Sequence, residues 1–217
     1  GLERELSLEE RTAWFYNILD NADRDSAQLA FKQLYECSEI GDPIAQCILA
    51  LGYYYGTFVE QDKEKGMSLL KKACECDCVD ALNTIGVILN GEKRYEESFP
   101  YHKRSAEMGD MYGLHNLGNA YFYARGVERD IKKAFDLWRE AADKGNPDSH
   151  YTLGNSFFRG EYVEQDINES IKCYIFAASH PCTTQRMAME QLVKAYQMID
   201  NKKEADFWSA KLSEIEE

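Results

Sequence analysis

Apolar and small residues recur along the chain at helical spacing, and whole blocks of this pattern return. In the stretch 111–125, four such residues stand at positions i, i+3, i+4 and i+7, namely Leu114, Leu117, Gly118 and Tyr121. That spacing places them on one face of an α-helix. After a polar break, a second face follows with Ala134, Leu137, Trp138 and Ala141. The stretch 111–145 is therefore predicted to be two helices joined by a short link.

The same columns of residues return along most of the chain. Glycines that follow an apolar residue stand 34, 32 and 36 residues apart, at Gly52, Gly86, Gly118 and Gly154. A second column of small residues comprises Ala30, Gly66, Ser98, Ala134 and Ser170. Four positions after each of these comes a bulky residue, at Leu34, Leu70, His102, Trp138 and Tyr174. Several columns with one period indicate a repeat protein built from helical hairpins.

The small residues in mid-helix are expected to mark close packing between helices. A glycine inside a helix costs about 1 kcal/mol relative to alanine, and it is tolerated where two helix backbones must approach closely. The bulky residue of the neighbouring helix then covers the glycine, as ridges pack into grooves. We therefore place the bulky column in the core. Three other aromatic residues look surplus to this packing, namely Tyr53, Phe122 and Tyr123.

A short acidic phrase fills the link of three predicted hairpins: VEQD at 59–62 and 163–166, and VERD at 127–130. Each phrase ends in an aspartate, Asp62, Asp166 or Asp130. A carboxylate there can accept hydrogen bonds from the first backbone N–H groups of the next helix. We therefore predict three helix N-caps. A cation site across the three links is the alternative, but successive links should stand apart along a stack of hairpins.

Glycines are predicted to close the turns. Gly126 offers the positive φ that the link needs. Gly41, Gly109 and Gly145 follow predicted second helices and are expected to end them.

Composition and charge narrow the functional class. The 217 residues are 44% apolar and 29% charged, as in an ordinary globular protein. A net charge of −13 argues against binding to nucleic acid, which needs clustered Lys and Arg. No apolar run approaches the roughly 18 residues that a membrane helix needs, so we expect no membrane insertion. The oligomeric state stays open at this stage.

The cysteines indicate a reducing compartment. There are seven, so they cannot all pair, and a cytoplasmic location is expected. The run Cys74-Glu-Cys76-Asp-Cys78 has one-residue spacing and no nearby histidine, whereas zinc sites space four ligands more widely. We therefore favour free thiols over a metal site. The first residue is not Met, so an upstream targeting segment, and with it a secreted or translocated form, remains open.

No motif indicates catalysis. The chain has no phosphate-binding Gly-rich loop, no dinucleotide fingerprint and no His-Glu-x-x-His pair. The four histidines, His102, His115, His150 and His180, are not placed by a catalytic motif. We therefore expect no enzymatic activity, no cofactor and no metal, and keep an enzyme as a minor alternative.

The repeated phrases resemble those of a known family. Leu-Gly-x-x-Tyr, Gly-Val-x-x-Asp, Lys-Ala-x-x-Trp and Ala-Ala-x-x-Gly, in this order at 117–145, resemble the Sel1-like repeat, a relative of the tetratricopeptide repeat. The resemblance implies an all-α, right-handed α-solenoid of about six antiparallel helical hairpins. It implies one continuous repeat domain over 1–217. Repeat units are expected at 43–77, 79–109, 111–145 and 147–181, with capping helices at 7–41 and 183–216.

Departures from the family pattern are local. The unit at 43–77 ends in Asp77 where glycine is expected, and the unit at 147–181 ends in Pro181. The unit at 79–109 has a shortened link, Asn90 to Arg94, closer to a plain tetratricopeptide hairpin. In the N-terminal cap, Ser7 with Glu10 is predicted to form a capping box before the run Trp14-Phe15-Tyr16. The C-terminal cap is predicted as helices from about 184 to 199 and from 202 to 215.

The resemblance also implies a function in protein recognition. In tetratricopeptide domains, the first helices of the hairpins line a concave groove that binds a peptide, and an Asn after the conserved glycine often holds its backbone. On this analogy Asn119 and Asn155 are the sharpest candidates, and we expect their joint replacement by Ala to remove binding with little effect on thermal stability. The full set of predicted groove residues is Tyr53, Asn83, Val87, His115, Asn119, Phe122, Tyr151, Asn155 and Phe158. The partner would be a protein or peptide, and the acidic charge favours a basic or amphipathic segment.

Other functions remain alternatives. The stack of hairpins can self-associate as a structural or assembly protein, or it can be a bacterial factor that binds a host protein. Some cysteine-rich relatives of this family have been linked to β-lactam binding or hydrolysis, with a cysteine pair in every unit. Here only Cys74 falls in such a column, and no partner stands near Asn83, which weakens the disulfide and β-lactam readings.

Overall fold

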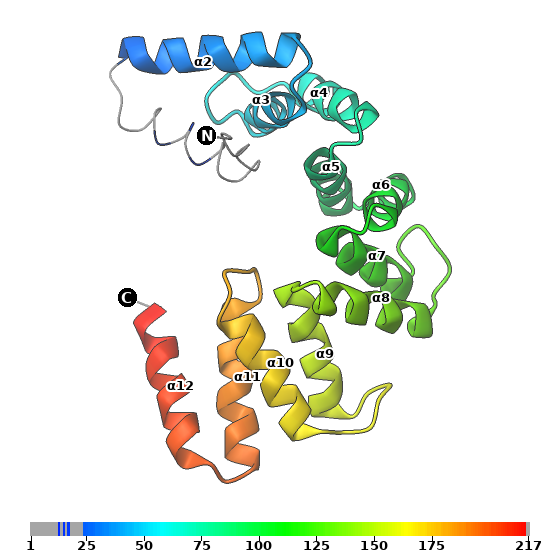
Figure 1. The fold of residues 1–217 in the computed structure, drawn as a ribbon, viewed down its shortest axis with the longest axis vertical. Helices are drawn as coiled ribbons and strands as arrows, with labels where there is room; N and C mark the ends of the chain where they lie inside the picture. The colour runs from blue at the N-terminus through cyan, green and yellow to red at the C-terminus, as the bar shows by residue number, and fades with distance from the viewer. Residues whose placement is uncertain (1–12, 14, 16, 18–23, 216–217) are drawn as a thin grey trace, which may run out of the picture. The chain divides into compact units, whose positions relative to one another are not determined.

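The computed structural model describes residues 13, 15, 17 and 24–215, and within these residues it contains helices and no strand (Figure 1). The helices run as follows: α2 Arg24–Glu39, α3 Pro43–Tyr55, α4 Lys63–Glu75, α5 Val79–Gly91, α6 Tyr95–Glu107, α7 Met111–Tyr123, α8 Ile131–Asp143, α9 Pro147–Arg159, α10 Ile167–Ala178, α11 Gln185–Met198 and α12 Lys202–Ile215. The predicted all-α class is confirmed. None of the described helices is long and apolar enough to cross a membrane.

The chain divides into two compact units, Gly1–Met108 and Gly109–Glu217. In unit 1, α3 packs against α4, and α5 packs against α6. In unit 2, the pairs are α7 with α8, α9 with α10 and α11 with α12. Each pair is a helical hairpin, as the sequence predicts. One continuous repeat domain stays a prediction.

The link aspartates cap the second helices. The carboxylates of Asp62, Asp130 and Asp166 each accept a hydrogen bond at 2.9 Å from the backbone N–H three residues later. This satisfies one of the N–H groups that a helix start leaves without a partner. The predicted N-caps are confirmed.

Positive backbone φ angles mark the predicted turns. Gly41, Gly109, Gly126 and Gly145 all have φ between 72° and 95°, where a side chain would be strained. Asp77 stands where the family pattern expects glycine, and it also adopts a positive φ of 54°.

Bulky side chains cover the helix glycines. A Cβ added at Gly118 would lie 2.6 Å from the Trp138 ring, and one at Gly86 would lie 2.5 Å from the His102 ring. Gly154 is covered in the same way by Tyr174, at 2.8 Å. The predicted core position of His102 is confirmed, since it is 0% exposed.

The first glycine departs from this pairing. Gly52 is covered by Phe58, 2.2 Å from an added Cβ, and not by the predicted Leu70. The ring comes from the link between α3 and α4. Leu70 is itself 0% exposed and packs in the apolar cluster with Tyr54 and Ala73.

The termini are described in part. Phe15 is 1% exposed and packs in an apolar cluster with Leu34 and Ile48, while the predicted capping box at Ser7 and Glu10 lies outside the described residues. At the other end, α11 and α12 match the two predicted helices to within one residue. Their apolar side chains join a cluster around Tyr174 and Leu192.

Candidate functional site

The first helices of two hairpins in unit 2 carry matching side chains. These positions stand at i, i+4 and i+7 on each helix, and we call them the unit 2 face: His115, Asn119 and Phe122 on α7, and Tyr151, Asn155 and Phe158 on α9. All six are partly buried. A hydrogen bond from α7 to α9 joins the two helices, between His115 Nδ1 and Ser149 Oγ at 2.8 Å. Six of the nine predicted groove residues therefore lie on two helices in contact.

Asn119 lies at the centre of a chain of hydrogen bonds. Trp138 Nε1 donates to Asn119 Oδ1 at 3.2 Å, and Asn119 Nδ2 lies 3.0 Å from His115 Nε2. An indole nitrogen only donates, so the amide oxygen must face Trp138 and the amide nitrogen must face His115. His115 Nε2 then accepts, and its Nδ1 carries the hydrogen and donates to Ser149 Oγ.

Burial keeps His115 neutral at physiological pH. Burial lowers the pKa of His115 to about 4, and the nearby carboxylate of Asp148 opposes this shift only in part. Ser149 is 0% exposed, so no substrate can reach its hydroxyl. The Ser149–His115 contact resembles a nucleophile with its base, but its burial assigns it a structural role.

Asn155 has an equivalent role one repeat later. Its Oδ1 accepts a hydrogen bond from the Tyr174 hydroxyl at 2.9 Å. Tyr174 is 0% exposed, and burial raises the pKa of its phenol. Both Asn side chains thus bond the polar tip of the ring that covers the preceding glycine. The expectation that Asn119→Ala with Asn155→Ala leaves stability nearly unchanged therefore needs correction, because both changes remove partners of buried polar groups.

The aromatic residues of the unit 2 face pack against the core. Phe122 lies 5.1 Å from Trp138 and 5.6 Å from Tyr162, measured between ring centroids. The guanidinium of Arg129 lies 5.5 Å from the Phe122 ring. The expectation that Phe122 is surplus to packing is wrong, because the neighbouring link brings Tyr162 against it. Phe158 and Tyr151 pack in turn on Tyr174.

The three predicted residues in unit 1 have separate surroundings. Lys65 Nζ donates to the Tyr53 hydroxyl at 2.8 Å, so Tyr53 packs against a charged neighbour. Ser105 Oγ donates to Asn83 Oδ1 at 2.7 Å, across the hairpin of α5 and α6. Val87 is 54% exposed.

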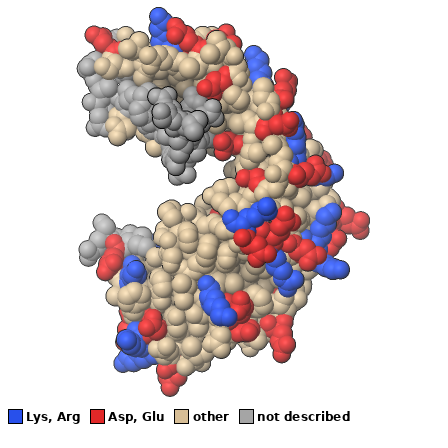
Figure 2. Space-filling view, in the orientation of Figure 1, with Lys and Arg blue, Asp and Glu red and all other residues tan. Residues whose placement is uncertain are grey.

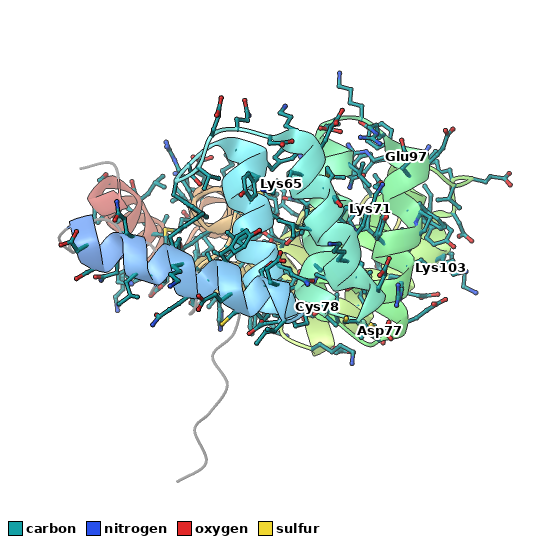
Figure 3. All side chains as sticks on the ribbon, turned by 90° about the horizontal axis from the view of Figure 1, so that it is seen from above. Lys65, Lys71, Asp77, Cys78, Glu97 and Lys103 are labelled. Carbon is teal, nitrogen blue, oxygen red and sulfur yellow. The ribbon has the colours of Figure 1, made fainter. Side chains whose placement is uncertain are left out.

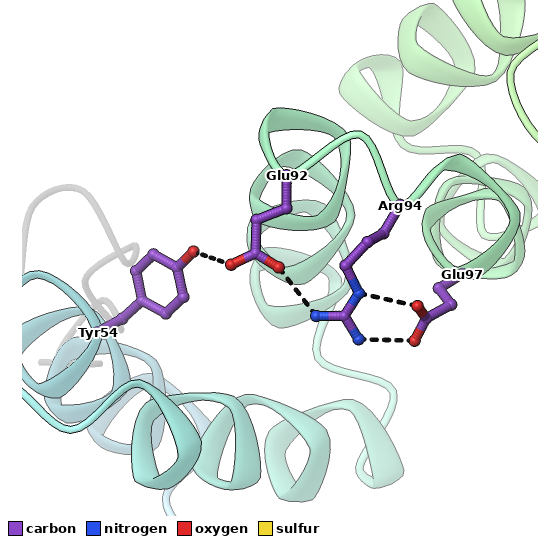
Figure 4. Close-up of polar contacts among 4 residues, drawn as sticks. All are labelled: Tyr54, Glu92, Arg94 and Glu97. Carbon is purple, nitrogen blue, oxygen red and sulfur yellow. Dashed lines mark hydrogen bonds and ion pairs between the residues drawn. The ribbon is translucent and has the colours of Figure 1, made fainter.

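A polar chain in unit 1 was not predicted from the sequence. The Tyr54 hydroxyl donates to Glu92, Arg94 donates to Glu92, and Arg94 forms a two-pronged ion pair with Glu97 at 2.7 and 2.8 Å (Figure 4). The hydrogen bond to Glu92 raises the pKa of Tyr54 to about 12. The same bond, together with Arg94, lowers the pKa of Glu92. The charged residues of the shortened link, Glu92 and Arg94, were the only signal for this contact.

A pocket of about 420 Å³ lies beside these hydrogen-bonded residues. Its lining comes from α3, α4 and the α5–α6 link, namely Tyr54, Lys63, Glu64, Met67, Ser68, Lys71, Glu92 and Arg94. Charges of both signs line it, and Arg94 already pairs with two carboxylates. The pocket therefore offers no single charge for a ligand to match.

Figure 2 shows acidic and basic side chains interspersed on the face in view. Among the described residues, no group of three or more His, Cys, Asp or Glu side chains is arranged to hold a metal ion.

The comparisons with known proteins identify the repeat. A family model described as Sel1 repeat matches residues 43–78, 112–146 and 147–181. The chain therefore carries Sel1 repeats, and the predicted resemblance is confirmed. The matches leave out the unit at 79–109, whose link is shortened. Among curated proteins, none matches the chain significantly.

Solved structures show the same fold. A Sel1 repeat protein from Oxalobacter formigenes aligns with a TM-score of 0.78 and 23% identity, over 96% of this chain and 88% of its own. A protective antigen of uropathogenic Escherichia coli with an SLR fold has a TM-score of 0.74 and 24% identity, over 96% of this chain and 46% of its own. An immunity protein from Pseudomonas aeruginosa has a TM-score of 0.62 and 19% identity, over 99% and 84%. Sel1 repeats commonly serve as protein–protein interaction modules and are generally non-enzymatic scaffolds.

Proposed function

We propose that the protein is a non-enzymatic adaptor that binds a peptide or protein segment on the unit 2 face. The observation that supports this most is the position of Asn155. Its oxygen is held by Tyr174, and the side chain stays partly exposed. A side-chain amide has two N–H donors, so Asn155 can donate to a peptide carbonyl without rearranging. Such preorganisation lowers the entropy cost of binding.

The neighbours of Asn155 favour an extended, partly apolar partner. Tyr151 and Phe158 flank it on α9, and Phe122 and Asn119 occupy matching places on α7. Aromatic side chains commonly anchor interfaces. With a net charge of −13 on the chain, a basic or amphipathic segment is the partner that fits best.

A substitution at Asn155 separates binding from folding. Asn155→Asp keeps an oxygen that accepts from Tyr174 but removes both N–H donors. Asn168→Asp makes the same change of charge at an exposed position on α10 and serves as the matched control. Peptides are first selected on the wild type from a displayed library of random sequences, and their affinities are then measured by fluorescence polarisation.

We expect Asn155→Asp to weaken the selected peptides about tenfold, which corresponds to about 1.4 kcal/mol and one lost hydrogen bond. Asn168→Asp should bind like the wild type. Equal binding by all three proteins would remove the unit 2 face from the proposal. If no peptide is selected and the mass in sedimentation rises with concentration, the self-association alternative takes its place.

A further inference from the structure

Cys47, which is distant in the sequence, joins Cys74 and Cys78 in one apolar cluster of unit 1. Cys47 lies within α3, Cys74 near the end of α4, and Cys78 at the N-cap of α5. Cys47 and Cys74 belong to one apolar cluster, and Cys78 packs against it. Figure 3 shows Cys78 beside Asp77, at the turn from α4 to α5.

The Cys47 and Cys78 side chains share this cluster and lie close enough for each to shift the pKa of the other. The interaction with Cys78, together with burial, raises the pKa of the Cys47 thiol. Cys78 stands at the N-cap of α5, where the nearby backbone N–H groups of Ala81 and Asp80 favour its thiolate. The interaction with Cys47, and to a lesser extent these N–H groups, lowers the pKa of Cys78 to about 7, although burial and the Asp80 carboxylate act in the opposite direction.

Access differs between the thiols of this region. Cys47 is 0% exposed and Cys74 is 3% exposed, whereas Cys78 is partly exposed. The thiolate is the form that attacks a disulfide. Of the three clustered cysteines, Cys78 is therefore the one that a reagent from solution meets first. Cys76 is more exposed than Cys78, but it lies outside the apolar cluster and serves as the natural control.

We propose that Cys78 and Cys47 form a redox pair, in which Cys78 attacks a low-molecular-weight disulfide and Cys47 resolves the product into a Cys47–Cys78 disulfide. The pair would join α3 and α5, the first helices of two successive hairpins, which pack against each other. Tyr53 and Val87, two of the predicted groove residues, lie on these helices. Oxidation would thus link the two helices of unit 1 that carry these predicted groove residues.

The reaction balances in two exchange steps. The Cys78 thiolate attacks one sulfur of glutathione disulfide, so a mixed disulfide forms and a glutathione thiolate leaves. Cys47 then attacks the Cys78 sulfur of the mixed disulfide, and its proton passes to the second departing glutathione. Two protein thiols are oxidised, and one glutathione disulfide is reduced to two thiols.

The test uses the full chain and its own tryptic peptides. The reduced protein is incubated with glutathione disulfide, alkylated and digested without reduction, and mass spectrometry follows residues 33–63 and 73–93. The first peptide holds Cys37 and Cys47, and the second holds Cys74, Cys76 and Cys78. We expect a cross-link between the two peptides, with the loss of two hydrogens, that dithiothreitol reverses.

Single substitutions assign the cross-link. It should disappear in Cys47→Ala and in Cys78→Ser, and persist in Cys37→Ser, Cys74→Ser and Cys76→Ser. Circular dichroism confirms that each variant is folded, and Cys78→Ser, at a partly exposed site, tests the pair if Cys47→Ala does not fold. A cross-link that survives in Cys47→Ala would overturn the proposal. A glutathione adduct on Cys78 without any cross-link, or modification confined to Cys76, would overturn it as well.

Discussion

The partly buried His115 should make unit 2 sensitive to mild acid. Its pKa is lowered from 6.5 to about 4 because burial penalises the charged ring. In the unfolded chain the ring takes its proton near pH 6.5, before the folded protein can. The contribution of the neutral His115 ring to the free energy of unfolding is therefore fully present above pH 6.5 and is lost as the pH falls toward 4.

The size of the effect follows from the shift. Each pKa unit is worth about 1.4 kcal/mol, so the shift corresponds to roughly 3 kcal/mol of the free energy of unfolding. Protonation of His115 also breaks a hydrogen bond, because Nε2 of a charged ring can no longer accept from the amide nitrogen of Asn119. Asn119 would then have to turn, and the indole N–H of Trp138 would lose its acceptor.

The assay compares the wild type with His115→Gln, whose side chain can donate and accept but does not titrate. Urea unfolding is followed by circular dichroism and tryptophan fluorescence at pH 7, 6, 5 and 4. Acidification acts on the carboxylates of both proteins equally, so only the difference between the two proteins is interpreted. We expect the stability of the wild type relative to His115→Gln to fall by about 3 kcal/mol between pH 7 and pH 4. Two stability curves that run parallel over this range would refute the argument.

Two further changes test the packing and the caps. Gly118→Ala should destabilise by about 1–3 kcal/mol, because the added methyl overlaps the buried Trp138 ring. Gly91→Ala meets no atom within 4 Å, so it should be neutral or stabilising in the same thermal melts; equal losses would refute the packing argument. Asp130→Ala should cost about 1 kcal/mol through the lost N-cap. The exposed Asp136→Ala, in the middle of α8, should cost clearly less in urea unfolding.

Local chemistry let the sequence determine the hairpins. The repeat period, the link aspartates and the turn glycines each act within a few residues, through helical spacing, capping and positive φ. These rules depend little on distant parts of the chain, and the predicted caps at Asp62, Asp130 and Asp166 are confirmed. The covering of Gly86, Gly118 and Gly154 by the bulky column was also predictable, because the same spacing returns in those units.

The polar partners were decided by the tertiary structure. The repeat pattern shows that Asn119 follows a glycine. It does not show that the amide oxygen of Asn119 accepts a hydrogen bond from Trp138, or that its amide nitrogen bonds to His115. The same holds for Phe58, which covers Gly52 from a link, and for Cys47, which meets Cys78 from another helix. Such contacts depend on side-chain reach and on the exact approach of the helices and links, whether the residues are near or far apart in the chain. Periodicity places residues on a face, whereas packing selects which of their polar atoms remain available to a partner.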